Sequence, residues 1–220
     1  MKIATLIAGL LLLSAPSVSS ADVLSLYSGG EMSFDYDQFP FGPVAGTFHA
    51  NGDILELLDF PPTGGGACTG ATLDTETTDY FAFVAGVRNP DNSIDLTFIH
   101  IRSDAGISTE SYQFDPVNQR VLFGFIDDAT AITMPEDLVN FDFRLWLDQV
   151  EAKHKFTGAL GNVTFTSISP EGIEGSFDGI LVDTEDTTLV SISNAMFRLS
   201  GDPLPVEDES WGSIKGRYQK

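Results

Sequence analysis

Residues 93–100 read SIDLTFIH, and every second side chain from Ile94 to Phe98 is apolar. In an extended chain, Ile94, Leu96 and Phe98 project to one side and Asp95 and Thr97 to the other. This alternation is typical of an antiparallel strand with one buried and one solvated face. The stretch therefore predicts a half-buried β-strand.

The same alternation recurs on both sides of this stretch. It appears in residues 32–36 (MSFDY), 121–125 (VLFGF), 163–165 and 173–182, with turn signals such as NPDN from Asn89 between the runs. A strand and its turn occupy about 8 to 14 residues, which predicts roughly ten to twelve strands. We therefore predict an all-β fold, an antiparallel β-sandwich or β-barrel with little helix, in which residues 22–200 form a single domain.

Residues 139–148 (VNFDFRLWLD) allow two interpretations. Alternate side chains are apolar, which predicts a long strand; these are Val139, Phe141, Phe143, Leu145 and Leu147. The preceding Pro135, Glu136 and Asp137 instead resemble the first turn of a helix. Because alternate residues cannot share one helical face, we expect a strand.

The first 21 residues have the layout of a secretory signal. Lys2 precedes the apolar residues 3–13, and the small residues Ser19 and Ala21 precede Asp22. The apolar run is shorter than the roughly 20 residues of a membrane-spanning helix. We expect cleavage before Asp22, a periplasmic or extracellular protein, no transmembrane helix, and an extended C-terminal tail over residues 201–220.

The composition is strongly acidic but still that of a folded chain. Asp and Glu number 32 against 11 Lys and Arg, which gives a net charge of −21. Hydrophobic residues make up 42% and include 17 Phe, enough for a core. The charge excludes nucleic acid as a partner and favours divalent cations. Cys68 is the single cysteine, so no intramolecular disulfide can form.

The chain lacks the local motifs of common hydrolases. There is no G-x-S-x-G and no H-E-x-x-H, and His49, His100 and His154 are isolated from one another. We therefore expect no catalytic function and name no catalytic residue. The many carboxylates leave a secreted glycoside hydrolase open, but they single out no pair.

Two acidic turns are candidate calcium sites, because calcium prefers oxygen ligands. The candidate ligands are Asp74, Glu76 and Asp79 in one turn and Asp183, Glu185 and Asp186 in the other. Neither turn matches the D-x-[DN]-x-[DN]-G loop, and a solvated hairpin tip is the alternative. Calcium is the only cofactor that the sequence suggests, and none is required.

Trp146 is the candidate for ligand recognition. In an extended chain it lies in the register of Asp142, Arg144 and Asp148, opposite the apolar face. An aromatic ring flanked by such groups suits a glycan-binding surface. The candidate ligand-binding residues are therefore Trp146, Arg144, Asp142 and Asp148. The alternative is that Trp146 packs beneath a loop or the tail.

These patterns predict an exported, non-catalytic β-sandwich protein that binds a glycan or a protein partner at its surface. A β-barrel that binds an apolar small molecule is the main alternative, because the chain is rich in phenylalanine. An outer-membrane barrel is less favoured, since the second face of the strands carries Asp, Thr, Ser and Arg.

Overall fold

The computed structural model describes residues 23–27, 29–53, 64–130, 143–169, 171–200 and 204–205. In these ranges the chain forms twelve strands and one helix, α3 (Phe143–Gln149). The strands are β1 (Val23–Tyr27), β2 (Gly29–Phe39), β3 (Ala45–Asp53), β4 (Gly66–Asp74), β5 (Asp79–Arg88), β6 (Ile94–Ser103), β7 (Ser111–Gln113), β8 (Val121–Ala129), β9 (His154–Ser169), β10 (Gly172–Asp183), β11 (Leu189–Ser200) and β12 (Leu204–Pro205). The predicted all-β fold with little helix is confirmed.

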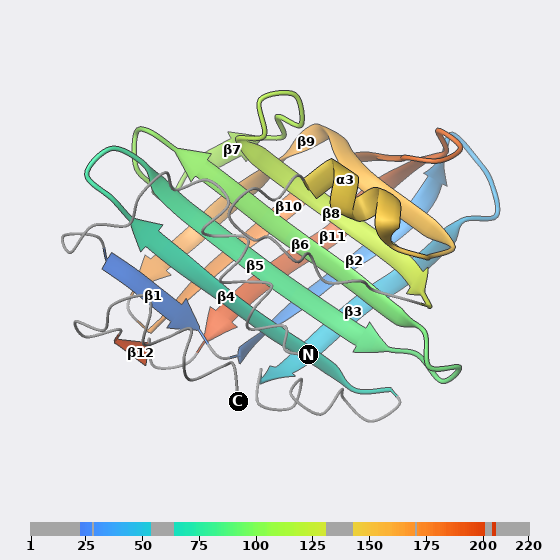
Figure 1. The fold of residues 1–220 in the computed structure, drawn as a ribbon, viewed down its shortest axis with the longest axis horizontal. Helices are drawn as coiled ribbons and strands as arrows, with labels where there is room; N and C mark the ends of the chain where they lie inside the picture. Colours follow the sequence, from blue (N-terminus) through green and yellow to red (C-terminus); the bar gives the residue numbers. More distant parts are fainter. Residues whose placement is uncertain are drawn as a thin grey trace.

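All twelve strands belong to one antiparallel sheet that curls into a nearly closed barrel. The strand order is β12-β1-β4-β5-β6-β8-β9-β10-β11-β2-β3, and β7 pairs with β9. At the closing seam β3 packs against β4, where Cys68 Sγ lies 3.5 Å from the Ala50 carbonyl oxygen. Figure 1 shows β4, β5, β6 and β8 as a front layer, with β10, β11, β2 and β3 crossing behind it.

The two layers differ in how many faces they bury. In the front layer, β5 is buried on both faces: Phe81 and Phe83 point into the barrel, whereas Tyr80 and Ala82 lie in a second apolar cluster outside it. In the rear layer, β10 alternates buried and exposed residues over much of its length. Among the described strands, those of the front layer therefore need a cover on their outer face.

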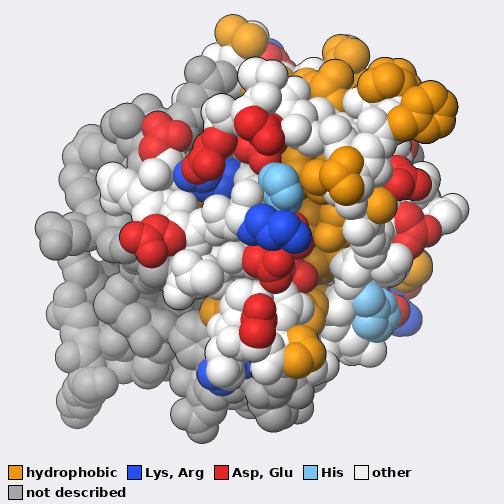
Figure 2. All heavy atoms as spheres, turned by 90° about the vertical axis from the view of Figure 1, so that its right-hand side faces the viewer, with side chains coloured by type: hydrophobic (Ala, Val, Ile, Leu, Met, Phe, Trp, Pro, Cys, Tyr) orange, Lys and Arg blue, Asp and Glu red, His pale blue; other side chains and the backbone are white. Residues whose placement is uncertain are grey.

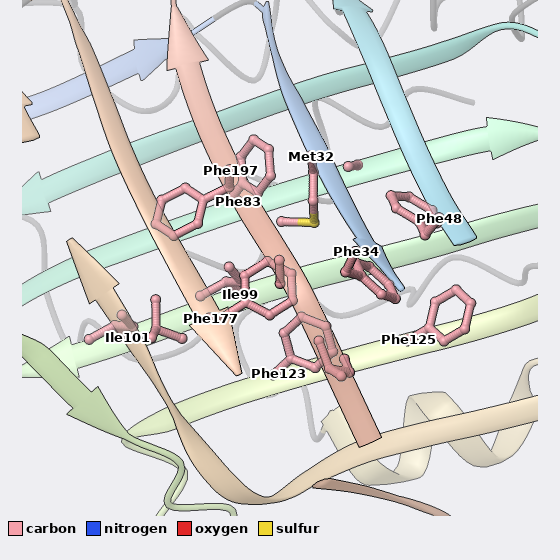
Figure 3. Close-up of a cluster of buried hydrophobic side chains, with 14 of the residues drawn as sticks. Met32, Phe34, Phe48, Phe83, Ile99, Ile101, Phe123, Phe125, Phe177 and Phe197 are labelled. Atoms are coloured by element: carbon pink, nitrogen blue, oxygen red, sulfur yellow. The ribbon is translucent and has the colours of Figure 1, made fainter. Parts of the chain in front are cut away.

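The interior of the barrel is filled by aromatic side chains. Figure 3 shows Phe34 and Phe48 facing Phe123 and Phe125 from opposite layers, with Met32 beside them. Ring centroids lie 5.2 Å apart for Phe34 and Phe125 and 4.9 Å apart for Phe123 and Phe177. Tilted and edge-on ring pairs of this kind stabilise a core beyond the burial of their area.

The expected strand over residues 139–148 is wrong for the part that the structure describes, because residues 143–149 form α3. Trp146, Leu147 and Val150 pack in the second cluster with Leu96 and Phe98. Positions 146, 147 and 150 share one helical face, so the helix covers the front layer with its apolar side. Burial of that layer's outer face outweighs the alternation that favoured a strand.

Several predictions concern residues outside the described ranges. The expected signal over residues 1–21 lies there, and so does most of the expected tail over residues 201–220. Of the tail, Leu204 and Pro205 pair with Leu26 and Ser25 of β1. No helix among the described residues is long and apolar enough to cross a membrane.

Candidate functional site

One end of the barrel carries a polar depression, which we call the end cleft. It lies where β2, β5, β8 and β10 end and β3, β6, β9 and β11 begin. It consists of two adjoining hollows of about 610 and 570 Å³ that share Asp128 and Lys153. The first is also lined by Asp91, Ser93, Thr130, Asp148, Val150, Glu151, Ala152, Lys155 and Glu185, and the second by Tyr36, Gln38, Pro43, Val44, Ala45, Asp127, His154, Asp186 and Thr188. Figure 2 shows this end of the molecule, with acidic, basic and histidine side chains around its centre.

His154 is held in the cleft by a buried carboxylate. It opens β9, and its Nδ1 lies 2.9 Å from Oδ2 of Asp183, the last residue of β10. The Asp183 side chain is only 2% exposed, and its Oδ1 accepts a hydrogen bond from the Glu185 backbone N–H. The His154 ring also stacks on Phe156. The imidazole is therefore oriented from two sides.

The β10–β11 turn places Asp186 beside this pair. Its Oδ1 accepts a 2.8 Å hydrogen bond from the Thr188 backbone N–H, which lowers the pKa of the exposed Asp186 carboxyl. Single ligand atoms of His154, Asp183 and Asp186 lie within 4.8 Å of one another. An imidazole with two carboxylates is a donor set that suits a divalent metal ion.

Three further carboxylates meet at the end of β8. Oxygens of Asp95, Asp127 and Asp128 lie within 4.8 Å of one another. Burial raises the pKa of Asp127, and the neighbouring charges of Asp95 and Asp128 raise it further. Burial also raises the pKa of Asp95. The group therefore concentrates negative charge that is only partly solvated.

A polar network holds Asp128 in an unusual backbone conformation. Its φ is +53°, and its backbone N–H donates to Asp95 Oδ1 at 2.9 Å. Asn89 Nδ2 lies 2.9 Å from the same Asp95 oxygen and 3.2 Å from Asp128 Oδ1. Non-glycine residues seldom adopt such a φ, although Asp does so more readily than most. Here, side chains of the β5–β6 turn and β6 fix the position.

Tyr36 and Lys153 face the same carboxylates from the other side. The Tyr36 hydroxyl donates to Asp127 Oδ1 at 3.4 Å, and burial together with Asp127 raises the tyrosine pKa. Lys153 Nζ lies 3.6 Å from Asp128 Oδ2 and 4.0 Å from Asp127 Oδ2. The lysine side chain is 64% exposed, so it is accessible to a ligand as well as to its partners.

The two turns predicted as calcium sites differ in how the structure arranges their carboxylates. Asp183 and Asp186 do come together, but with His154, while Glu185 Oε1 lies 2.6 Å from the buried Lys155 Nζ. In the other turn Asp74 and Asp79 pair across the ends of β4 and β5, and Glu76 is exposed. These three do not form one of the ligand groups found among the described residues.

The predicted glycan platform around Trp146 is not assembled as expected. Trp146 is 4% exposed and packs, as part of α3, against the outer face of the front layer. Asp148 is exposed and lines the end cleft. Asp142 and the side chain of Arg144 lie outside the described part of the chain. The helix causes the difference, since it turns Trp146 and Asp148 to different sides.

Sequence reasoning missed most of the end cleft, although one signal was available. In β8, the register that buries Val121, Phe123 and Phe125 continues to Asp127. In β2, the register of Met32 and Phe34 similarly continues to Tyr36. A polar residue at the end of an inward-facing register marks the rim of a barrel. The contributions of Lys153 and His154 depend on strand order, which alternation does not reveal.

An exposed aromatic tip adjoins the cleft. The β2–β3 connection contains residues 39–43 (FPFGP), where Phe41 is 93% and Phe39 51% exposed. Gln38, which precedes these residues, and Pro43, the last of them, line the second hollow. The tip is therefore continuous with the cleft wall.

Comparisons with known proteins give no match. No protein-family model, no curated protein and no solved structure matches this chain.

Proposed function

We propose that this chain is an exported, non-catalytic binding protein, and that it binds a glycan in the end cleft. The observation that carries the proposal is the convergence of polar side chains from four loop regions on one accessible depression. Carboxylates accept, and Lys153 donates, the hydrogen bonds that sugar hydroxyls require. The signal-like residues 1–21 support export.

The packing of the barrel favours this cleft over the interior as the binding site. The interior is occupied by phenylalanine rings in mutual contact, for example Phe125 and Phe156 with centroids 6.0 Å apart. An apolar ligand would have to displace such rings, whereas a polar ligand meets an open depression at the end. The cleft is therefore the better-supported site.

A divalent cation is a second candidate ligand, favoured by the group of His154, Asp183 and Asp186. Calcium was expected from the acidic turn alone, but the imidazole also suits zinc or another transition metal. A cation here would lie beside the second hollow and could act with a glycan or without one.

Thermal melting of the purified protein tests both ligands. Calcium, zinc and a glycan panel are added in turn, each against a chelator-treated sample. A ligand that binds the folded state raises the melting temperature by mass action. His154→Gln should abolish a shift caused by a cation, whereas His49→Gln, at a site 56% exposed on β3, should keep it. If no addition moves the melting temperature, the binding function loses its support.

A further inference from the structure

The polar contacts proposed for the end cleft do not explain the exposed phenylalanines of residues 39–43, which we call the aromatic tip. Large apolar side chains are usually covered, and a bare cluster of them marks an interaction surface. Phe41 and Phe39 are 93% and 51% exposed and follow directly from the cleft wall. In Figure 2, hydrophobic side chains gather at the upper right, beside the charged centre of this end. A ligand in the cleft can therefore touch polar groups and aromatic rings together.

We propose that the aromatic tip is a stacking platform for a neutral or amino-sugar glycan, whose hydroxyl groups bind in the end cleft. This inference rests on the proposed function and names the ligand class of the same site. A pyranose ring has an apolar C–H face that packs on an aromatic ring, and hydroxyls around its edge. The rings of the tip can pack on the apolar face of the sugar. Its hydroxyl groups can form hydrogen bonds with Asp128, Asp186 and Lys153.

The tip is held in place before a ligand arrives. The Gln38 backbone N–H donates to the Val44 carbonyl at 2.7 Å, and Gln38 Oε1 accepts from the Val44 N–H at 3.3 Å. Pro40 and Pro43 restrict the backbone between these anchors. Because little conformational freedom remains to be lost, exposed rings on such a tip can contribute to affinity.

The charge of the site selects among glycans. Among the described residues, seven carboxylates and two lysines line the end cleft, and the whole chain carries a net charge of −21. Uronic acids and sialic acids would be repelled, whereas the ammonium group of an amino sugar would be attracted. The preference should therefore run from amino sugars through neutral sugars to acidic sugars.

A printed array of neutral, amino-sugar and acidic glycans, probed with the labelled protein, tests this inference. The best glycan is then titrated against the wild type and three variants. Phe41→Ala removes the exposed ring, and Lys153→Trp fills the junction of the two hollows. Val117→Ala is the matched control, because Val117 is 80% exposed and lies between β7 and β8, beyond the opposite end of β8.

We expect binding to neutral or amino-sugar glycans, weakened by Phe41→Ala about tenfold or more and unchanged by Val117→Ala. If Lys153→Trp abolishes binding but Phe41→Ala leaves it intact, the proposal of a stacking platform is overturned, whereas the proposal of glycan binding in the end cleft stands. Binding that neither variant affects, or binding to no glycan, would overturn both proposals. A preference for acidic glycans would overturn the proposed ligand class.

Discussion

Asp127 combines a buried position with a titratable charge. Its side chain is 10% exposed, and burial together with Asp95 and Asp128 raises its pKa above the ordinary value of 3.8. A carboxyl whose pKa is higher in the folded than in the unfolded state favours folding when protonated. Its contribution to the stability of the folded state is complete below the ordinary pKa, and this contribution is lost as the pH rises through the folded-state pKa.

We therefore expect Asp127→Asn to raise the melting temperature by a few degrees at neutral pH and to have little effect near pH 3. Asn can still accept the hydrogen bond from Tyr36, so the substitution mainly removes the charge. Thermal melting between pH 3 and pH 8 measures the difference. A variant that is less stable than the wild type at neutral pH would contradict this explanation.

Asp186→Asn is the control, because it should lower the melting temperature at neutral pH. The Thr188 backbone N–H lowers the Asp186 pKa, so this carboxylate favours folding at neutral pH and the contribution is lost as the pH falls. The two variants should therefore change the pH dependence of melting in opposite directions.

At the scale of one residue, sequence reasoning had its clearest limits. It named Asp183 and Asp186 but assigned Glu185 to the same group, whereas Lys155 binds Glu185 instead. It named Trp146 as a candidate platform, with packing of the ring as the alternative, and the ring is buried. Side-chain partners depend on neighbouring strands and on the helix, and spacing along the chain carries no information about either.

At the scale of the element, α3 depends on the tertiary contacts of its apolar face. A seven-residue helix is too short to be stable alone, so its packing on the front layer must hold it. We expect Trp146→Ala to lower the free energy of unfolding by about 3–5 kcal/mol, as for other buried aromatic residues. Urea denaturation measures the loss, and Gln149→Ala, at an exposed position of the same helix, should change stability by less than about 0.5 kcal/mol. A mild effect of Trp146→Ala would show that the helix does not need this contact.

Gly124 in β8 tests the packing between strands. A Cβ atom at this position would collide with the ring of Phe98 on β6. We expect Gly124→Ala to destabilise the protein by about 1–3 kcal/mol through overpacking. Gly86→Ala in β5 is the control, because its Cβ would meet Leu96 Cδ1 at an ordinary 3.4 Å. Equal melting temperatures for the two variants would contradict the close packing of Phe98 on Gly124.

Strands were the elements that sequence predicted best. Alternation located β2, β6, β8, β9 and β10, because each has at least one face in an apolar cluster. The same rule failed at α3, where Phe143, Leu145 and Leu147 alternate as in a strand. The buried residues there are instead Trp146, Leu147 and Val150, which share one helical face. Alternation also does not predict the strand order, which places β2 beside β11.

At the scale of the whole molecule, the net charge of −21 opposes compaction. Salt screens such repulsion, with a Debye length of about 10 Å at 0.1 M and about 3 Å at 1 M. We expect the melting temperature to rise as sodium chloride is raised from low concentration, and to rise equally in potassium chloride. A fall, or a response to one cation only, would indicate a specific ion effect instead.

The central claim is that the end of the barrel around Lys153 and His154 is where this protein binds its ligand. The most direct test is a nuclear magnetic resonance titration of the isotope-labelled protein with the best glycan from the array. We expect the largest shift changes in residues 36–45, 127–128, 153–155 and 183–188, which surround the end cleft. Changes concentrated on the outer face of β9, β10 and β11, or no changes at saturating glycan, would contradict the claim.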